Sequence, residues 1–235
     1  MKLFLTSNIG GIKKINGKKI PVNFLQSNKF LDNLKKSLNS YNKFVLVASN
    51  PNNYEQNDEF LNLDSKALEA SGFKFKEYIT LDYRNKDNIK NTLDNCSLIF
   101  LCGGDTYQQN LFFNDINLKK YLKDLGCCIV GISAGAINSA KNVFNSPEKE
   151  EDFKTSFVLN GLDLTNINIE PHFDKKNNNK IKMNTILEES YNRNIYGIED
   201  GSYILDNVVY GKCYKIHNWE ITLICDNEQI ISINE

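Results

Sequence analysis

Residues 125–140, LGCCIVGISAGAINSA, contain the motif Gly131-Ile-Ser-Ala-Gly135 between two different kinds of sequence. The residues before the motif are apolar and β-prone, and the residues after it are small and compatible with a helix. A G-x-S-x-G motif at a sharp strand-to-helix turn presents its serine as a nucleophile. The stretch therefore predicts a strand, a turn at Ser133 and a helix. The alternative interpretation is a glycine-flanked turn without chemistry.

Short apolar runs alternate with helical patterns around this motif. Strands are expected at residues 2–6, 43–49 and 75–81, within 97–106 up to a Gly-Gly turn, and from 127 up to the turn at Ser133. Helices are expected at 29–41, 57–72, 85–95, 117–126 and 180–192. Such alternation predicts a doubly wound, mostly parallel sheet sandwiched by helices. The last part of the chain has turns at Asp-Gly, Tyr-Gly and Asp-Asn, which predict antiparallel hairpins added to this sheet. The expected fold class is α/β, in a single domain over residues 1–235.

The composition excludes several classes of protein. The 235 residues are 41% hydrophobic, which suits one α/β domain with a sizeable core. The 28 basic and 29 acidic residues leave no electrostatic footprint for nucleic acid or an anionic membrane. The lysine-rich residues 10–21, GGIKKINGKKIP, are expected to form a solvated turn region.

Cysteine and histidine usage argues against a metal site, and no cofactor is expected. None of the six cysteines forms a C-x-x-C pair and only two histidines are present, so buried reduced thiols are expected. The N-terminal MKLFLTSN has too short an apolar core for a signal peptide, and no apolar run approaches the roughly 18 residues of a membrane helix. These features predict a cytoplasmic protein.

Polar residues follow the expected strands at the carboxyl ends, where open α/β sheets bind ligands. They are the segment GGDT (103–106), Ser133, His172 in NIEPHFD and Asp200 in YGIEDGS. Ser133 needs a base, because a free serine hydroxyl is a poor nucleophile at neutral pH. His172, at an expected strand end, is the predicted base, and His217, in the hairpin region, is expected to be structural.

A carboxylate should orient the imidazole. The candidates are Asp200, Glu199, Glu170 and the acidic run Glu148 to Asp152. An oxyanion hole is also required, and the Ala134 N–H and the Gly103-Gly104 turn are its natural donors.

Four blocks in this order resemble peptidase family S51: LCGGDTYQQN (101–110), GISAGAINSA (131–140), EPHFD (170–174) and GIEDGSYI (197–204). This family contains dipeptidase E (aspartyl dipeptidase) and cyanophycinase, and the resemblance runs from about Lys2 to Val209. It implies a class I glutamine amidotransferase-like, flavodoxin-like sandwich and a serine hydrolase that needs no metal.

The resemblance also implies residue roles. Ser133 would be the nucleophile, His172 the base and Asp200 the third member, with Glu148 as an alternative acid. Gly104 and Ala134 would form the oxyanion hole. Three further residues of the first block, Gly103, Asp105 and Thr106, are expected to contact substrate.

Two departures from the family pattern bear on the substrate. Asp105 stands where dipeptidase E typically has Asn. Lys180 and Lys182 occupy a region in which dipeptidase E has an Arg linked to binding the aspartate of its substrate. A lysine is a point charge rather than a two-pronged fork.

The expected activity is hydrolysis of small peptides, including dipeptides with an N-terminal aspartate. The alternatives are a cyanophycinase-like or isopeptide hydrolase, and a catalytically silent amidotransferase-like binding domain. Residues 174–180 are expected to form a lid, and both a monomer and a homodimer are compatible with the sequence.

Overall fold

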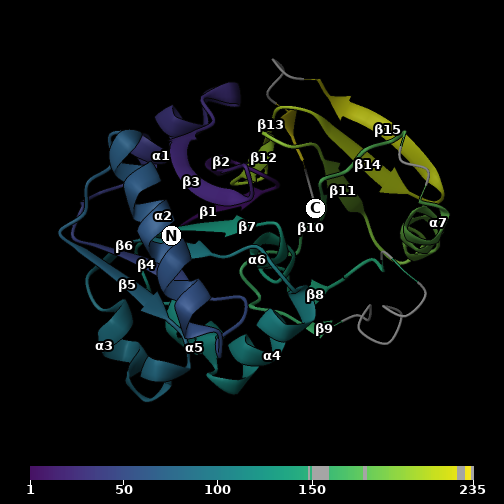
Figure 1. The fold of residues 1–235 in the computed structure, drawn as a ribbon. Coiled ribbons are helices and arrows are strands. Elements are labelled where there is room, and N and C mark those ends of the chain that lie inside the picture. Colours follow the sequence, from purple (N-terminus) through teal and green to yellow (C-terminus); the bar gives the residue numbers. More distant parts are fainter. Residues whose placement is uncertain (148, 150–158, 177–178, 227–230, 234–235) are drawn as a thin grey trace.

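A sheet of eight described strands forms the centre of the computed structural model, which describes residues 1–147, 149, 159–176, 179–226 and 231–233 (Figure 1). The order across the sheet is β16 (Ile231–Ser232), β13 (Val208–Tyr210), β12 (Tyr203–Leu205), β1 (Lys2–Thr6), β7 (Cys128–Ile132), β6 (Cys96–Leu101), β4 (Lys43–Val47) and β5 (Glu77–Leu81). β1, β7, β6, β4 and β5 are parallel, whereas β12, β13 and β16 are antiparallel to their neighbours. The expected mostly parallel sheet is confirmed.

Helices cover both faces of this sheet. Side chains alternate along each strand, so Phe44 and Leu46 of β4 enter one core and Val45 and Val47 enter the other. The first core is closed by α1 (Phe30–Ser37) and α2 (Tyr54–Ala70). The second is closed by α3 (Ile89–Leu93), α4 (Thr106–Asp115), α5 (Leu118–Leu122) and α6 (Ala134–Ile137). This arrangement is the predicted doubly wound sandwich.

The C-terminal strands divide between two sheets, instead of all joining the first. A sheet of four strands has the order β10 (Asn168–Pro171), β11 (Ile195–Ile198), β14 (Cys213–His217) and β15 (Glu220–Cys225). β10 and β11 are parallel, and the other neighbours are antiparallel. α7 (Lys180–Glu189) packs on this sheet through Ile186. Figure 1 shows the smaller sheet and α7 beside the central sheet.

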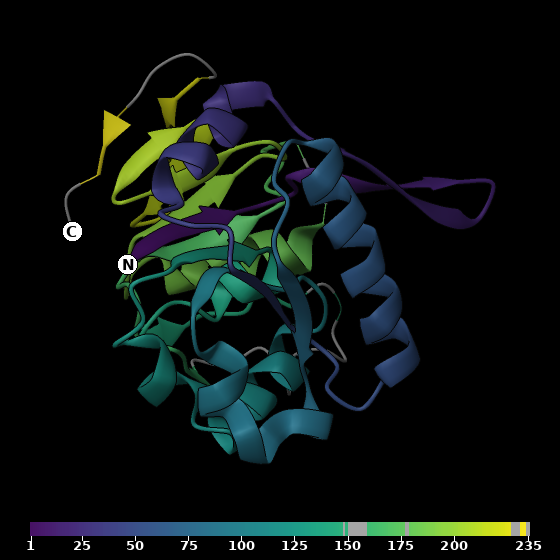
Figure 2. The ribbon, with the colours of Figure 1, turned by 90° about the vertical axis from the view of Figure 1, so that its left-hand side faces the viewer.

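Two segments differ from the sequence-based expectation. Residues 10–21 belong to a hairpin of β2 (Gly10–Ile15) and β3 (Lys18–Phe24), which projects beyond the central sheet next to α2 (Figure 2). Asn16 and Gly17 both have positive φ, so Asn-Gly forms the tight hairpin turn that this dipeptide favours. The expected strand at 97–106 ends at Leu101, and α4 follows, with the Asp105 carboxylate accepting the N–H of Gln108.

Shorter elements complete the described chain. They are the 3-10 helices η1 (Ser27–Lys29) and η2 (Tyr83–Asn88) and the strands β8 (Asn142–Val143) and β9 (Leu159–Asn160). All six cysteines are free, and five of them are buried. No helix within the described part of the chain combines the length and apolar character that crossing a membrane requires.

Two glycines allow α6 to pack tightly after β7. A Cβ on Gly131 would lie 2.7 Å from Cα of Ala136, and a Cβ on Gly135 would lie 2.1 Å from the carbonyl oxygen of Leu101 in β6. Both distances are too short for a real contact. The glycines of the G-x-S-x-G motif are therefore required by packing between backbones.

Gly135→Ala should destabilise the fold by about 3 kcal/mol, because the new methyl group overlaps a backbone carbonyl that belongs to the central sheet. Urea denaturation measures this loss. Gly126→Ala is the matched control, since a Cβ at that exposed glycine meets no atom within 4 Å. Equal stability of the two variants would contradict the packing constraint.

Asp64 is a carboxyl group on the buried face of α2, with 7% of its surface exposed. Burial raises its pKa from 3.8 to about 7. The folded protein therefore holds a proton on Asp64 that the unfolded chain releases between pH 3.8 and about 7. Since the folded state binds the extra proton, its stability falls as the pH rises through this window.

Asp64→Asn should raise the free energy of unfolding at pH 8 by up to about 4 kcal/mol relative to the unsubstituted chain, and should change it little at pH 4. Urea denaturation at the two pH values tests this difference. Glu55→Gln, an exposed acid on the same helix, is the control and should show no such pH dependence. An Asp64→Asn effect that is equal at both pH values would contradict the assignment.

Candidate active site

The carboxyl ends of three parallel strands meet at one edge of the central sheet. The register pairs Thr6 with Ile132 across β1 and β7, and Leu101 with Gly131 across β6 and β7. The residues that follow these strands are therefore neighbours, and a Cβ on Gly103 would lie 3.6 Å from the Cβ of Ser133. This edge carries the serine predicted to be the nucleophile.

Ser133 occupies the turn between β7 and α6 with φ 49° and ψ −107°. Its N–H donates to the carbonyl of Thr6 at 3.0 Å, and its carbonyl accepts the N–H groups of Ala136 and Ile137, both at 3.0 Å. A positive φ is unusual for a residue with a side chain and marks a strained turn. Both backbone polar groups are satisfied, so the hydroxyl is the group that Ser133 presents.

His172 reaches this hydroxyl from the smaller sheet. It follows β10 with φ 55°, and the next residue, Phe173, donates its N–H to Ile198 of β11 at 3.1 Å. The Oγ of Ser133 lies 3.0 Å from Nε2 of His172, and Nδ1 of His172 lies 2.7 Å from Oδ1 of Asp200. The structure thus brings the three predicted residues into one hydrogen-bonded line.

Asp200 lies in the turn two residues after the end of β11, next to Gly201, whose N–H donates to the carbonyl of Asn8 at 2.8 Å. Burial acts to raise the pKa of Asp200. The hydrogen bond from Ser7, the charge and hydrogen bond of His172 and a backbone hydrogen bond from Asn8 outweigh burial and hold this pKa below its usual value. Asp200 is therefore ionised at neutral pH.

Two other candidate acids have different partners. Glu170 is 2% exposed; its carboxylate contacts Nζ of Lys182 at 2.8 Å and accepts the hydroxyl of Ser146 at 2.8 Å. Glu199 contacts Nζ of Lys212 at 2.8 Å and accepts the Tyr214 hydroxyl at 3.4 Å. Of the described candidates, Asp200 is the carboxylate bonded to the His172 ring.

The acidic run Glu148 to Asp152 has no described carboxylate. Glu148, the alternative acid, lies outside the described residues, as do residues 150–152. Its suggested role stays a prediction from the sequence.

The expected oxyanion donors lie at the same edge. Gly104 has φ 143°, and a Cβ there would lie 2.3 Å from Oγ of Ser49, so the position demands glycine. Ala134 is the first residue of α6, where an N–H has no acceptor within its own helix. Thr106 is 8% exposed in the first turn of α4, and Asp105 caps that helix. Substrate contact by Gly103, Asp105 and Thr106 stays a prediction.

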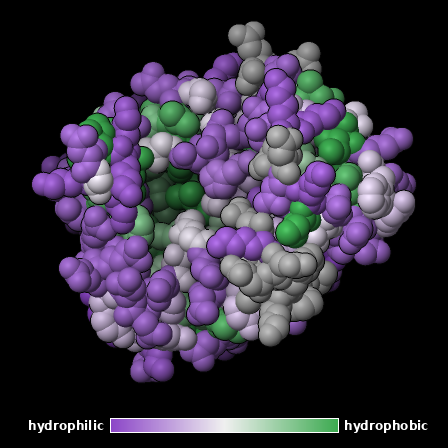
Figure 3. All heavy atoms as spheres, turned by 45° about the vertical axis from the view of Figure 1, so that its right-hand side comes forward, coloured by the Kyte–Doolittle hydropathy of each residue, from purple (hydrophilic) through white to green (hydrophobic). Residues whose placement is uncertain are grey.

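A cavity of about 490 Å³ adjoins the His172–Asp200 pair. The side chains of these two residues are 49% and 53% exposed, so solvent reaches both. The lining also includes Phe173, Asp174, Lys175, Lys176, Glu199, Lys212 and Tyr214. On the face of the molecule drawn in Figure 3, hydrophilic residues cover most of the surface, and hydrophobic residues are visible mainly inside a hollow and in small patches.

Residues 174–180 were expected to form a lid. Residues 174–176 line the cavity and α7 begins at Lys180, whereas residues 177 and 178 lie outside the described residues. The lid stays a prediction.

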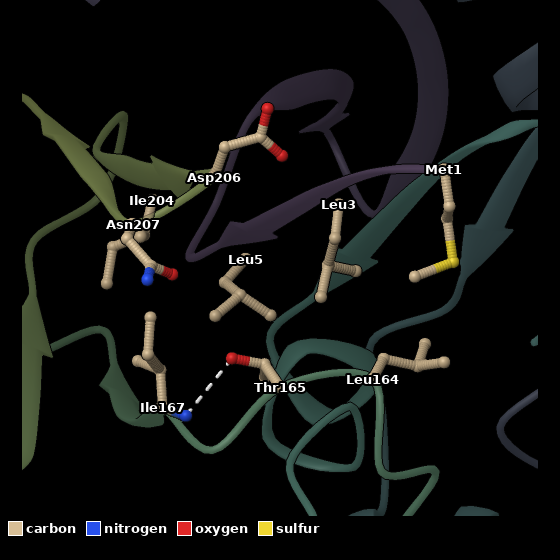
Figure 4. A pocket seen from close by; sticks show the side chains of 9 residues that line it. All are labelled: Met1, Leu3, Leu5, Leu164, Thr165, Ile167, Ile204, Asp206 and Asn207. Carbon is tan, nitrogen blue, oxygen red and sulfur yellow. Dashed lines mark hydrogen bonds between the residues drawn. The ribbon is translucent and has the colours of Figure 1, made fainter. Parts of the chain in front are cut away.

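A second cavity, of about 190 Å³, contains none of the predicted site residues. Leu3 and Leu5 of β1 face Thr165 and Ile167 across it (Figure 4). No group of three or more His, Cys, Asp or Glu side chains in the described ranges is arranged to hold a metal ion.

Sequence reasoning missed Ser7, which is fully buried behind the His172–Asp200 pair. Its Oγ lies 2.7 Å from Oδ1 of Asp200, 3.3 Å from Nδ1 of His172 and 2.8 Å from the backbone N of His172. A signal was present, because Ser7 directly follows a predicted strand, as Ser133 does. No motif marked it.

Comparisons with solved structures agree with this fold. A peptidase from an acI-B1 actinobacterium has TM-score 0.70 at 16% identity over 99% of this chain and 96% of its own. A candidate peptidase E from Listeria monocytogenes EGD-e has TM-score 0.58 at 17% identity over 99% of this chain and 98% of its own. At these identities the likeness establishes the shared fold.

Sequence comparison identifies the family. No curated protein matches the chain. The model of peptidase family S51 matches residues 18–207, which is most of the chain and includes all four motif blocks. The chain therefore belongs to peptidase family S51, a family of serine peptidases.

Proposed function

We propose that this peptidase hydrolyses small peptides through an acyl-enzyme, with Ser133 as nucleophile, His172 as base and Asp200 as the orienting carboxylate. One observation carries the proposal: the Ser133 hydroxyl, the His172 ring and the Asp200 carboxylate form a continuous line with contacts of 3.0 and 2.7 Å. These contacts have the lengths that proton transfer requires.

The proposed reaction begins with a proton transfer. Ionised Asp200 accepts the Nδ1–H of His172, so the lone pair on Nε2 faces the Ser133 hydroxyl. Nε2 takes the hydroxyl proton as Ser133 attacks the peptide carbonyl, and the Gly104 and Ala134 amides donate to the oxyanion. His172 then protonates the leaving amine. Water, activated by the same ring, releases the acyl group.

Charge around the cavity bears on the substrate. Lys182 is paired with buried Glu170, so its charge is already balanced. Lys175, Lys176 and Lys212 line the cavity beside His172, and Lys212 is paired with Glu199. The cavity volume of about 490 Å³ suits a small ligand. Dipeptides with an N-terminal aspartate are therefore the first substrates to test.

A dipeptide panel with Asp, Glu, Asn or a neutral first residue tests the proposal. Ser133→Ala should lower kcat at least about 1,000-fold on every cleaved member, because the variant has no nucleophile. Ser139→Ala is the matched control. Ser139 is a buried serine six residues away whose hydroxyl donates to the Gly135 carbonyl, and this variant should retain activity.

With β-linked aspartyl peptides added, the same panel separates the alternatives. Cleavage of β-linked aspartyl peptides alone would favour an isopeptide hydrolase of the cyanophycinase type. Full activity in Ser133→Ala, or no activity toward any peptide in the unsubstituted protein, would contradict the proposed reaction.

Asp200→Asn should lower kcat roughly 100- to 10,000-fold, because an amide can donate to Nδ1 and favours the wrong tautomer of His172. Glu199→Gln is the control: Glu199 is the adjacent residue and bonds Lys212 instead of the ring, so its variant should stay within a few-fold of the unsubstituted protein. Steady-state kinetics at pH 7.5 compares the two. A larger loss in Glu199→Gln would reassign the third member.

A further inference from the structure

Ser7 connects three chain segments at the candidate site. It follows β1, is 0% exposed, and its own N–H donates to the carbonyl of Ser202 at 3.4 Å. Its hydroxyl contacts the Asp200 carboxylate at 2.7 Å and the His172 backbone N–H at 2.8 Å. The same oxygen lies 3.3 Å from Nδ1 of His172.

The number of protons and lone pairs on a serine hydroxyl determines which partner donates in each of these contacts. A hydroxyl has one proton and two acceptor lone pairs. The His172 N–H can only donate, so it uses a lone pair of Ser7. The ionised carboxylate of Asp200 can only accept, so it takes the single hydroxyl proton at 2.7 Å. No proton of Ser7 is left for Nδ1, which must therefore donate its own proton to Asp200.

The backbone of His172 depends on the same hydroxyl. Its φ of 55° is in the left-handed region, which costs energy for a residue with a side chain. The hydrogen bond from its N–H to Ser7 is a buried contact that holds this conformation. About half of each side chain in the His172–Asp200 pair is exposed to water. The hydrogen bonds of Ser7 therefore hold the pair in place from its buried side.

We propose that Ser7 is a positioning residue, whose hydroxyl fixes the direction of the Asp200 carboxylate, the Nδ1–H tautomer of His172 and the backbone that carries the ring. The inference rests on the proposed roles of His172 and Asp200. Ser7 does not touch the reacting atoms, so it acts through these two residues.

The chain offers a matched control in Ser190. This serine is also 0% exposed, accepts the N–H of Trp219 at 2.9 Å, and donates to the Leu187 carbonyl at 2.6 Å. Trp219 has φ 66°, so Ser190 also supports a left-handed residue. Ser190→Ala removes the same kind of buried hydroxyl without contacting His172 or Asp200.

The kinetic test compares Ser7→Ala with Ser190→Ala on a dipeptide that the unsubstituted protein cleaves. Ser7→Ala should lower kcat about 10- to 100-fold with KM nearly unchanged, as expected when a hydrogen bond to a charged group is lost. Ser190→Ala should retain the kcat and KM of the unsubstituted protein. Equal kinetics of the two variants would overturn the proposal.

A second readout is independent of substrate. The protein has two histidines, His172 and His217, so their ring N–H protons are readily assigned by NMR. The Nδ1–H resonance of His172 should be visible in the unsubstituted protein and in Ser190→Ala, and should be lost to exchange with water in Ser7→Ala. An unchanged resonance in Ser7→Ala would overturn the proposal, even if no peptide were cleaved and the proposed function failed.

If Ser7→Ala does not fold, Ser7→Cys is the variant to test in its place. It nearly keeps the volume of the side chain but donates only weakly, so the Nδ1–H resonance should broaden and kcat should fall below that of Ser190→Ala. A Ser7→Cys protein with the resonance and kcat of the unsubstituted chain would overturn the proposal.

Discussion

The hydrogen bonds that join the end of β1 to the ends of β10 and β11 hold the two halves of the candidate site together. Ser133 belongs to the eight-stranded sheet, whereas His172 and Asp200 follow strands of the four-stranded sheet. The carbonyl of Asn8 accepts the N–H of Gly201, and the Ser7 hydroxyl bonds both His172 and Asp200. Together with the hydrophobic core that the two sheets share, these contacts fix the position of the imidazole relative to the serine.

Close backbone packing then sets where Ser133 lies. Gly135 lets α6 approach the carbonyl of Leu101, and Gly104 leaves room for Ser49. At both positions a side chain would overlap an atom of a neighbouring strand or strand end. The glycines therefore allow the ends of β4, β6 and β7 to lie close together, next to the turn that carries Ser133.

Charge is divided between the interior and the cavity. The Glu170–Lys182 pair is almost fully buried, joins the strand that precedes His172 to α7, and has its charges balanced inside the fold. The lysines beside His172 instead line an open cavity, where solvent or a ligand can meet them. The lysines of this region therefore fall into two groups, one paired inside the fold and one beside the site.

Local patterns were sufficient for part of this structure. The alternation of apolar runs and helical patterns predicted the parallel sheet, because burial imposes a different period on strands and on helices. The spacing within Gly131–Gly135 predicted the turn at Ser133, and the polar ends of later strands predicted His172 and Asp200. The helix at Thr106–Asp115 was missed, since the helix buries side chains on several faces and lacks a clean amphipathic period.

What the sequence by itself determined is the fold class, the strand-to-helix turn at Ser133 and a short set of candidate partners. Only the tertiary structure decided that the C-terminal strands form two sheets, that Asp200 rather than Glu199 or Glu170 meets the ring, and that Ser7 stands behind the pair. The physical reason is distance along the chain. Ser7 lies 165 residues from His172 and 193 from Asp200, so their contacts arise from strand pairing and not from any local period.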